Sequence, residues 1–285
     1  MTENLKDVVI IYHDKCRDGF GAAYAAWKKY GDDASYLPVR EHNYPPEGLV
    51  DKEIYIVDFS FHLPILTELN DKNKKVVVID HHRSVQEDVE SFPQNIFDTN
   101  HSGAVLAWKY FHPDTTVPPL LEYIEDHDIW NRTLPNNREY NAALGEYEVT
   151  FEAWDELVEK LKDEKFLAEH IKTGATISKF EDKLVDSLLT FKERVLFEGH
   201  EVWALNVSRT YRSILGHHLA KLNEDEGEIA FGIVYYRSNA SVNISLRSNG
   251  DVDVSAIAEK HGGGGHKNAA SLRVDSFTDL PFTFI

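Results

Sequence analysis

The chain has 285 residues, 42% of them hydrophobic, and this length and composition favour a globular protein with two domains. Its 48 acidic residues outnumber its 30 basic residues, and the resulting net charge of −18 disfavours long double-stranded nucleic acid as a partner. Because no apolar run is long enough for a membrane span and the first residues lack a signal-peptide pattern, we expect a cytoplasmic protein without membrane contact. The single cysteine, Cys16, fits a reducing compartment.

The first third of the chain alternates apolar runs with helical patterns. Strands are predicted at 7–12, 34–39, 53–57 and 75–79, and helices at 19–30 and from Pro64 onward. The strands are almost continuously apolar, which is typical of parallel strands covered on both faces. The predicted fold class is therefore α/β, and ligand sites in such sheets lie beyond the carboxyl ends of the strands.

Aspartates and histidines follow three of these strands. They are His13, Asp14 and Asp18 after the first strand, Asp58 after the third, and Asp80, His81 and His82 after the fourth. Asp126 and Asp128 follow a helical stretch that begins near Pro119. Taken singly, Asp58 also fits a turn former and His13 a structural histidine, but four segments that converge on one edge favour a metal centre. Carboxylates and imidazoles without cysteine pairs suit Mn²⁺ or Mg²⁺ better than structural zinc.

The remainder of the chain changes character twice. Residues 151–197 are rich in charge, with apolar residues at helical spacing, and predict a pair of connecting helices. Strands at 229–236 and 241–247 predict a hairpin, followed by a helix at 254–260. Arg247 offers a planar guanidinium to phosphate. The glycines at 262–265 allow backbone N–H groups to approach a phosphate or a nucleobase, although a flexible loop would have the same composition.

Two motifs together resemble those of one protein family. The triplet Asp80-His81-His82 and the later stretch HGGGGHKNAAS at 261–271 resemble the signatures of the DHH phosphoesterase family with a C-terminal DHH-associated domain, in its oligoribonuclease and RecJ-like branch. The resemblance spans nearly the whole chain. It implies an N-terminal parallel-sheet domain and a smaller C-terminal α/β domain joined by a helical linker. The expected boundaries are 1–145 for the DHH catalytic domain, 146–198 for the helical connector and 199–285 for the substrate-binding domain.

The resemblance also implies roles for individual residues. The implied metal ligands are His13, Asp18, Asp58, His81 and Asp126, with Asp126 preferred to Asp128. The implied catalytic residues are Asp58, which would bridge two Mn²⁺ ions (or Mg²⁺), Asp80, which would orient the triplet, and His82, which would face the scissile phosphate. The implied substrate-binding residues are His101, Arg247, Gly263, Gly264, Gly265 and His266.

Cys16 departs from the family pattern. It stands where the first aspartate of an Asp-x-Asp pair is expected, two residues before Asp18. Three possibilities are open for the metal centre: Asp14 replaces the missing carboxylate, the Cys16 thiolate coordinates, or one cation binds more weakly. A small, partly buried side chain without any role in binding is the plainest alternative.

The function implied by the resemblance is that of a metal-dependent hydrolase. We expect a manganese phosphodiesterase that degrades short single-stranded oligonucleotides, either nanoRNA or linear dinucleotides, to mononucleotides by an exonuclease-type mechanism. Two alternatives remain: a cyclic-dinucleotide phosphodiesterase, and a nucleotide-binding or sensing protein whose catalysis is attenuated by the altered first motif. A RecJ-like enzyme for long single strands is disfavoured, because such an enzyme would bring more basic and aromatic tracks.

Overall fold

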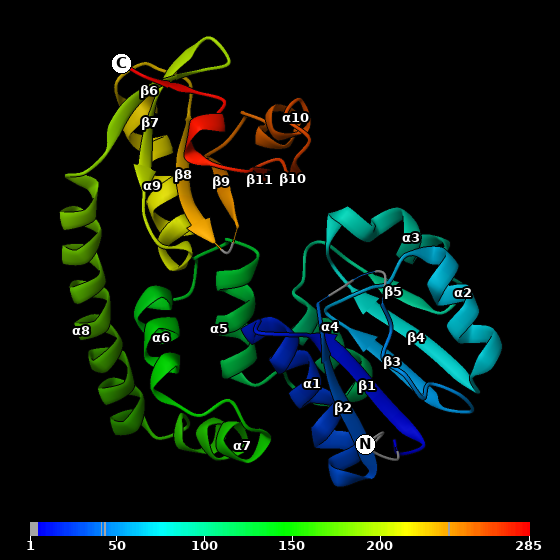
Figure 1. Cartoon of the computed structure of the whole chain (residues 1–285). Helices are drawn as coiled ribbons and strands as arrows, with labels where there is room; N and C mark the ends of the chain where they lie inside the picture. The colour runs from blue at the N-terminus through cyan, green and yellow to red at the C-terminus, as the bar shows by residue number, and fades with distance from the viewer. Residues whose placement is uncertain (1–4, 41, 43, 239) are drawn as a thin grey trace. The chain divides into compact units, whose positions relative to one another are not determined.

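Two sheets organise the chain, one in each of two units (Figure 1). The computed structural model describes residues 5–40, 42, 44–238 and 240–285, and the side chain of His266 is also outside the described part. Unit 1 extends to Ser178, and unit 2 comprises Lys179–Ile285. Both units are α/β, with a parallel sheet in the first and a mixed sheet in the second, so the predicted fold class is confirmed.

The sheet of unit 1 has five strands in the order β2-β1-β3-β4-β5, and all neighbouring strands are parallel. The strands are β1 (Val8–His13), β2 (Ala34–Val39), β3 (Glu53–Val57), β4 (Lys75–Asp80) and β5 (Asn95–Phe97). Successive residues of a strand point to opposite faces. Ile10 therefore belongs to one hydrophobic core and Ile11 to the other, and both are fully buried. Burial on both faces explains the unbroken apolar runs of the sequence.

Helices cover both faces of this sheet. The helices from the start of the chain to the junction with unit 2 are α1 (Arg17–Tyr30), α2 (Leu63–Lys72), α3 (Gln86–Ser91), α4 (Gly103–Phe111), α5 (Pro119–Asp128), α6 (Asn137–Ala143), α7 (Phe151–Lys160) and α8 (Glu164–Leu189). Short 3₁₀ turns lie at Gly31–Asp33, Arg83–Val85 and Leu144–Glu146. The core on one face draws on α1, α4, α5 and α7, and the core on the other face draws on α2 and α3.

The sheet of unit 2 has seven strands in the order β10-β11-β9-β8-β7-β6-β12. They are β6 (Glu193–Phe197), β7 (His200–Asn206), β8 (Phe231–Ser238), β9 (Ser241–Ser248), β10 (Gly264–His266), β11 (Ala269–Val274) and β12 (Thr283–Phe284). Within this sheet, as far as the structure describes it, β7 and β8 pair in parallel and the other neighbouring strands pair antiparallel. The helices are α9 (Arg212–Asp225) and α10 (Val254–Glu259), with 3₁₀ turns at Arg209–Tyr211 and Phe277–Asp279.

The long helix α8 carries the chain from unit 1 into unit 2 (Figure 1). The prediction of helices over 151–197 is wrong for its last five residues, which form β6. In β6 the buried Val195 and Phe197 flank the exposed Leu196, a period of two that a strand requires and a helix does not. Within the described part of the chain, no helix combines the length and the apolar character needed to cross a membrane.

Candidate metal centre

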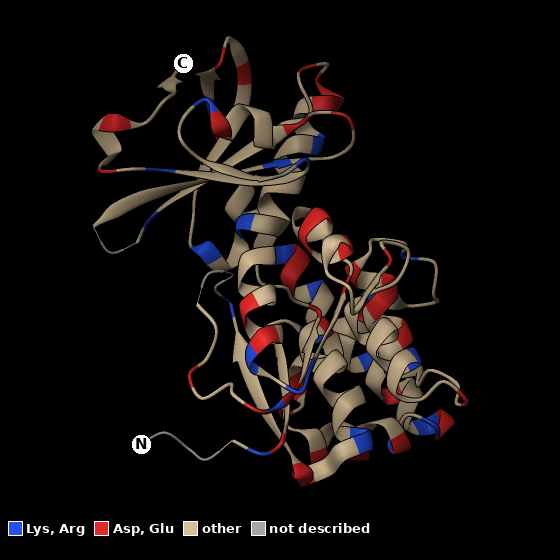
Figure 2. Cartoon of the chain, turned by 90° about the vertical axis from the view of Figure 1, so that its right-hand side faces the viewer, with Lys and Arg blue, Asp and Glu red and all other residues tan. Residues whose placement is uncertain are grey.

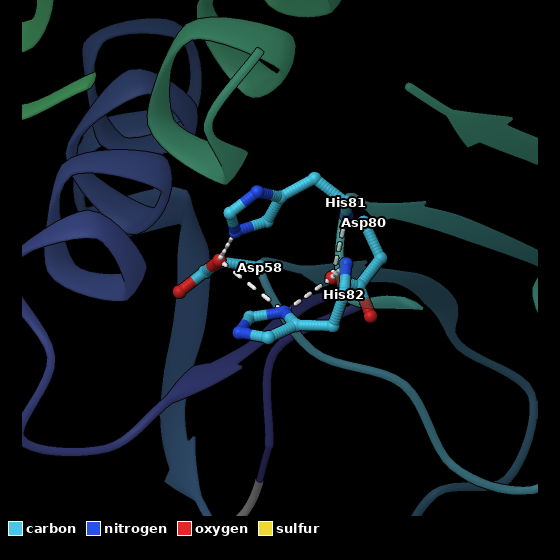
Figure 3. Close-up of side chains that lie close together, drawn as sticks. All are labelled: Asp58, Asp80, His81 and His82. Carbon is cyan, nitrogen blue, oxygen red and sulfur yellow. Dashed lines mark hydrogen bonds and ion pairs between the residues drawn. The ribbon is translucent and has the colours of Figure 1, made fainter. Parts of the chain in front are cut away.

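The predicted aspartates and histidines gather at one edge of the unit 1 sheet. β1 ends at His13, β3 ends just before Asp58, and β4 ends at Asp80. Because these strands are parallel neighbours, their carboxyl ends lie side by side. Figure 3 shows the carboxylate of Asp58 between the imidazoles of His81 and His82. Its Oδ1 is 3.2 Å from His81 Nε2 and 3.8 Å from His82 Nδ1.

Three groups of potential ligands overlap at this edge. They are Asp58, Asp80, His81 and His82; His13, Cys16 and Asp58; and Asp18, His81 and Asp128. Within each group, one ligand atom from every residue lies within 4.8 Å of the others. Asp58 and His81 each belong to two groups, so the three groups form one continuous cluster.

Several buried polar atoms in this cluster lack a hydrogen-bond partner. They are His13 Nδ1, both carboxylate oxygens of Asp58, Asp80 Oδ2 and His81 Nε2. They make up five of the eight such side-chain atoms in the described residues, so the unsatisfied groups are concentrated here. Each buried polar atom without a partner costs about 1–3 kcal/mol. Coordination to divalent cations would satisfy the four atoms that belong to His13, Asp58 and His81, and the residues present therefore fit a metal ion.

The protonation equilibria of the cluster lead to the same conclusion. Burial and the neighbouring Asp18 raise the pKa of Asp58 well above its ordinary value. The same two causes raise the pKa of Asp128 to about 6. Burial and Asp58 raise the pKa of the Cys16 thiol well above its ordinary range. Burial and mutual repulsion make these acidic groups resist ionisation together, and a bound cation would reverse that preference.

Asp80 fixes the position of His82. Its Oδ1 accepts hydrogen bonds from the backbone N–H groups of His81 and His82 at 2.7 and 3.1 Å, and it lies 2.7 Å from His82 Nδ1 (Figure 3). Burial lowers the pKa of His82, but the Asp80 carboxylate outweighs it and raises this pKa to about 9. The other ring nitrogen, Nε2, points away from Asp80 (Figure 3).

Asp18 ties the cluster to the first turn of α4. Its two carboxylate oxygens accept hydrogen bonds from the backbone N–H groups of Gly103 at 2.7 Å and Ala104 at 3.0 Å. A Cβ atom on Gly103 would lie 2.4 Å from Asp58 Cβ, so only glycine allows this approach. The sequence analysis missed Gly103, although Ser102 before it is a helix-capping signal.

The structure brings Asp128, and not the predicted Asp126, into the cluster. Asp126 lies outside all three groups, and its carboxylate accepts hydrogen bonds from Thr133, Leu134 and Asn137 at 2.8–3.1 Å. Asp128 Oδ2, by contrast, is 3.6 Å from His81 Nε2. Residues two positions apart on an α-helix point in directions about 200° apart around its axis. Only one of the two carboxylates can therefore face the cluster.

Two other predicted residues lie outside the cluster. Asp14 forms an ion pair with Arg40, whose Nε is 2.9 Å from Asp14 Oδ2. His101 lies between Glu125 and Lys109, with 3.1 Å from Nδ1 to Glu125 Oε2 and 2.8 Å from Nε2 to Lys109 Nζ. Of the alternatives for the first motif, the structure thus brings Cys16, and not Asp14, next to His13 and Asp58.

A second candidate site lies in unit 2, where Arg247 lines a cavity of about 700 Å³. Gly264 and Gly265 line it, whereas Gly263 packs so closely on β11 that a Cβ atom would lie 2.3 Å from the Ser271 carbonyl oxygen. The cavity also contains arginines that the sequence analysis missed: Arg209, Arg212 and Arg273. Among the described residues, no acidic side chain lines it. Figure 2 shows basic positions along the strands of this unit.

Arg247 is suited to bind an anion. Its side chain is buried, its Nε has no hydrogen-bond partner among the described residues, and one terminal nitrogen donates to the Leu246 carbonyl at 2.8 Å. Burial and the nearby Arg212 lower its pKa to about 10. An anionic ligand would accept a hydrogen bond from Nε and would compensate the buried positive charge of the guanidinium group. The backbone of His266 pairs with Ala269 between β10 and β11, but its side chain is not part of the described structure.

Comparison with known proteins assigns a domain to the C-terminal part of the chain and finds relatives along most of its length. Residues 202–281 match the model of the DHHA1 domain. The chain is 29% identical over 296 residues to the uncharacterized protein R106 of Acanthamoeba polyphaga mimivirus, covering 96% of this chain and 69% of that protein. It is 26% identical over 239 residues to the cyclic-di-AMP phosphodiesterase PdeA of Listeria monocytogenes, covering 81% of this chain and 35% of PdeA.

One solved structure shares the fold along almost its whole length. It is the pGpG-specific phosphodiesterase PggH from Vibrio cholerae, with a TM-score of 0.52 and 13% sequence identity. The match covers 95% of this chain and 94% of PggH.

Replacing Asp126 with alanine tests its anchoring role. We expect Asp126→Ala to lower the free energy of unfolding by about 2–4 kcal/mol, because several buried donors lose their acceptor. These hydrogen bonds hold the pKa of Asp126 below its ordinary value even though burial opposes ionisation. The stabilisation by the Asp126 carboxylate should therefore be complete above the ordinary aspartate pKa. It should vanish as the pH falls through the lowered pKa of Asp126 in the folded protein. Urea unfolding in chelator measures both effects, and an unchanged unfolding midpoint would contradict them.

Asp128→Asn should have the opposite effect on stability. In chelator at pH 7 we expect it to stabilise the protein by on the order of 1–2 kcal/mol, a value reduced because one side of the carboxylate is in water. Since the pKa of Asp128 rises to about 6, the gain should be complete above that pH and disappear below the ordinary aspartate pKa. The same variant should bind Mn²⁺ more weakly by calorimetric titration. Stabilisation without weaker cation binding would place Asp128 outside the metal centre.

Proposed function

We propose that this chain is a metal-dependent phosphodiesterase of short linear oligonucleotides. Its predicted resemblance to the DHH phosphoesterases with a C-terminal DHH-associated domain is confirmed. The observation that carries the proposal is the set of five unpartnered buried polar atoms at the edge of the unit 1 sheet. The residues that would hold divalent cations are His13, Cys16, Asp18, Asp58, His81 and Asp128. Mn²⁺ or Mg²⁺ bound there, as two ions in the predicted arrangement, would activate a water molecule and neutralise phosphoryl oxygens.

The chain's own residues supply positioning and a proton. His82, whose pKa rises to about 9, carries its proton at neutral pH. With Nδ1 held by Asp80, its Nε2 is free to donate a hydrogen bond to a phosphoryl or leaving-group oxygen. This donor stabilises the negative charge that develops as the phosphodiester is cleaved, and the buried Asp80 keeps it oriented.

The arginine-lined cavity of unit 2 supports a small polyanionic substrate. Its volume of about 700 Å³ is in the range of sites that hold one small ligand. Arg247, with Gly264 and Gly265, would bind a phosphate of the nucleotide. We therefore favour di- to pentanucleotides cleaved by an exonuclease-type reaction, that is, an oligoribonuclease activity. A long strand would find no extended basic track on a chain of net charge −18.

A cyclic-dinucleotide phosphodiesterase is the second candidate. It is supported by the similarity to PdeA of Listeria monocytogenes, whose name gives cyclic di-AMP as its substrate. The linear substrate named for PggH supports the first candidate. A protein that only senses nucleotides is the weaker alternative, because a mere binder would not need the continuous cluster of ligands around Asp58 and His81.

The activity is tested with labelled RNA and DNA of two to five and of 24 nucleotides, in Mn²⁺ or in EDTA. We expect metal-dependent release of mononucleotides from the shortest substrates, and a loss of at least about 100-fold in kcat/KM for His81→Ala. His200→Ala, at the exposed start of β7, is the matched control and should remain active. Tight binding without turnover would favour the sensing alternative. Faster cleavage of cyclic di-AMP than of its linear product would favour the second candidate.

A further inference from the structure

Trp130 is exposed next to the candidate metal centre. It follows α5 directly and stands two residues after Asp128, so its Cα is within about 7 Å of the Asp128 Cα. Its side chain is 57% exposed, whereas the other four tryptophans of the chain are buried or half-buried. An indole left in water forgoes a large hydrophobic gain, so its position requires an explanation.

The loop that carries Trp130 is held in an unfavourable conformation. Trp130 and Arg132 have φ angles of 61° and 50°, in the left-handed region that side chains with a Cβ atom rarely adopt. Asp126 holds them there: its carbonyl oxygen accepts a hydrogen bond from Arg132 N at 3.0 Å, and its carboxylate accepts hydrogen bonds from Thr133 N and Leu134 N. The indole is thus presented by an anchored backbone and not by a frayed chain end.

Arg132 adds a positive charge to this aromatic surface. Its guanidinium carbon is 4.2 Å from the centroid of the Trp130 ring, a cation–π contact. Structural stabilisation would account for this contact. It would not account for a mostly exposed indole in strained backbone beside a candidate metal ligand. Together the two side chains offer what a nucleotide requires, a flat apolar ring for the base and a cation for its phosphate.

We propose that Trp130 and Arg132 form a stacking platform that holds the nucleobase adjoining the cleaved phosphodiester. This inference rests on the proposed function. Because the Cα atoms of Trp130 and Asp128 are within about 7 Å of each other, a base stacked on the indole would keep its own phosphate near the cluster that contains Asp128. Stacking accepts any base, because every base has a π-face. The platform therefore selects nucleotides over phosphodiesters that carry no base, without selecting a base sequence.

The test compares Trp130→Ala, Trp130→Phe and the control Phe180→Ala, whose ring is exposed on α8. Each variant is assayed in Mn²⁺ with diadenylate and with a dinucleotide analogue that lacks the bases. For Trp130→Ala we expect kcat/KM on diadenylate to fall by about 5- to 100-fold, mainly through KM, with no change on the base-free analogue. Trp130→Phe should retain most of the activity, and Phe180→Ala all of it. An equal loss on both substrates, or on neither, overturns the proposal.

Binding of adenosine monophosphate and of ribose 5-phosphate separates this inference from the proposed function. Calorimetric titration in Mn²⁺ should show at least about fivefold weaker binding of adenosine monophosphate by Trp130→Ala, and unchanged binding of ribose 5-phosphate. If the wild type cleaves neither dinucleotide, the proposed function fails, and this titration still decides the role of Trp130. Equal affinity of wild type and Trp130→Ala for adenosine monophosphate overturns the inference even if diadenylate is cleaved.

Discussion

The mutual repulsion of buried carboxylates at the edge of the unit 1 sheet is the constraint around which this unit is built. Asp18 and Asp58 are each only 1% exposed, and Asp18 contributes to the raised pKa of Asp58. Two local features keep them together. The backbone N–H groups at the start of α4 donate hydrogen bonds to the Asp18 carboxylate, and Asp58 has a left-handed backbone conformation with a φ of 53°. Such an arrangement is costly unless a cation is present, which is why the cluster favours a functional reading.

The two units distribute charge in opposite ways. Unit 1 concentrates carboxylates and imidazoles around Asp58, whereas the cavity of unit 2 gathers four arginines without an acidic neighbour among the described residues. A chain with a net charge of −18 would otherwise repel a nucleotide. A nucleotide would therefore be attracted only locally, by cations at the cluster of unit 1 and by the cavity arginines of unit 2.

The fold and much of the candidate site could be predicted from the sequence, because they depend on periodicity and strand order. Unbroken apolar runs predicted parallel strands, and polar residues such as Asp58 at their ends predicted a shared edge. The choice between Asp126 and Asp128 could not be predicted, because it depends on the rotation of one helical turn and on the loop folded back over it. The other arginines of the unit 2 cavity were also missed. Arg273 enters the cavity through the register of β11 with β9, where it pairs with Asn243, and Arg209 comes from a 3₁₀ turn outside the sheet. Polar residues at Asn243, Ser245 and Arg247 already marked one face of β9.

The contact of Asp18 with α4 has a consequence for biosynthesis. Its carboxylate binds amides 85 and 86 residues further along the chain, and Asp128 follows still later. During synthesis, the first carboxylates therefore emerge from the ribosome long before the segments that position them, and loops of this length close slowly. The cluster is complete only when unit 1 has largely been made. A cation would therefore be bound late in synthesis, and a truncated product that ends before α5 would lack Asp128 and with it the complete set of potential ligands.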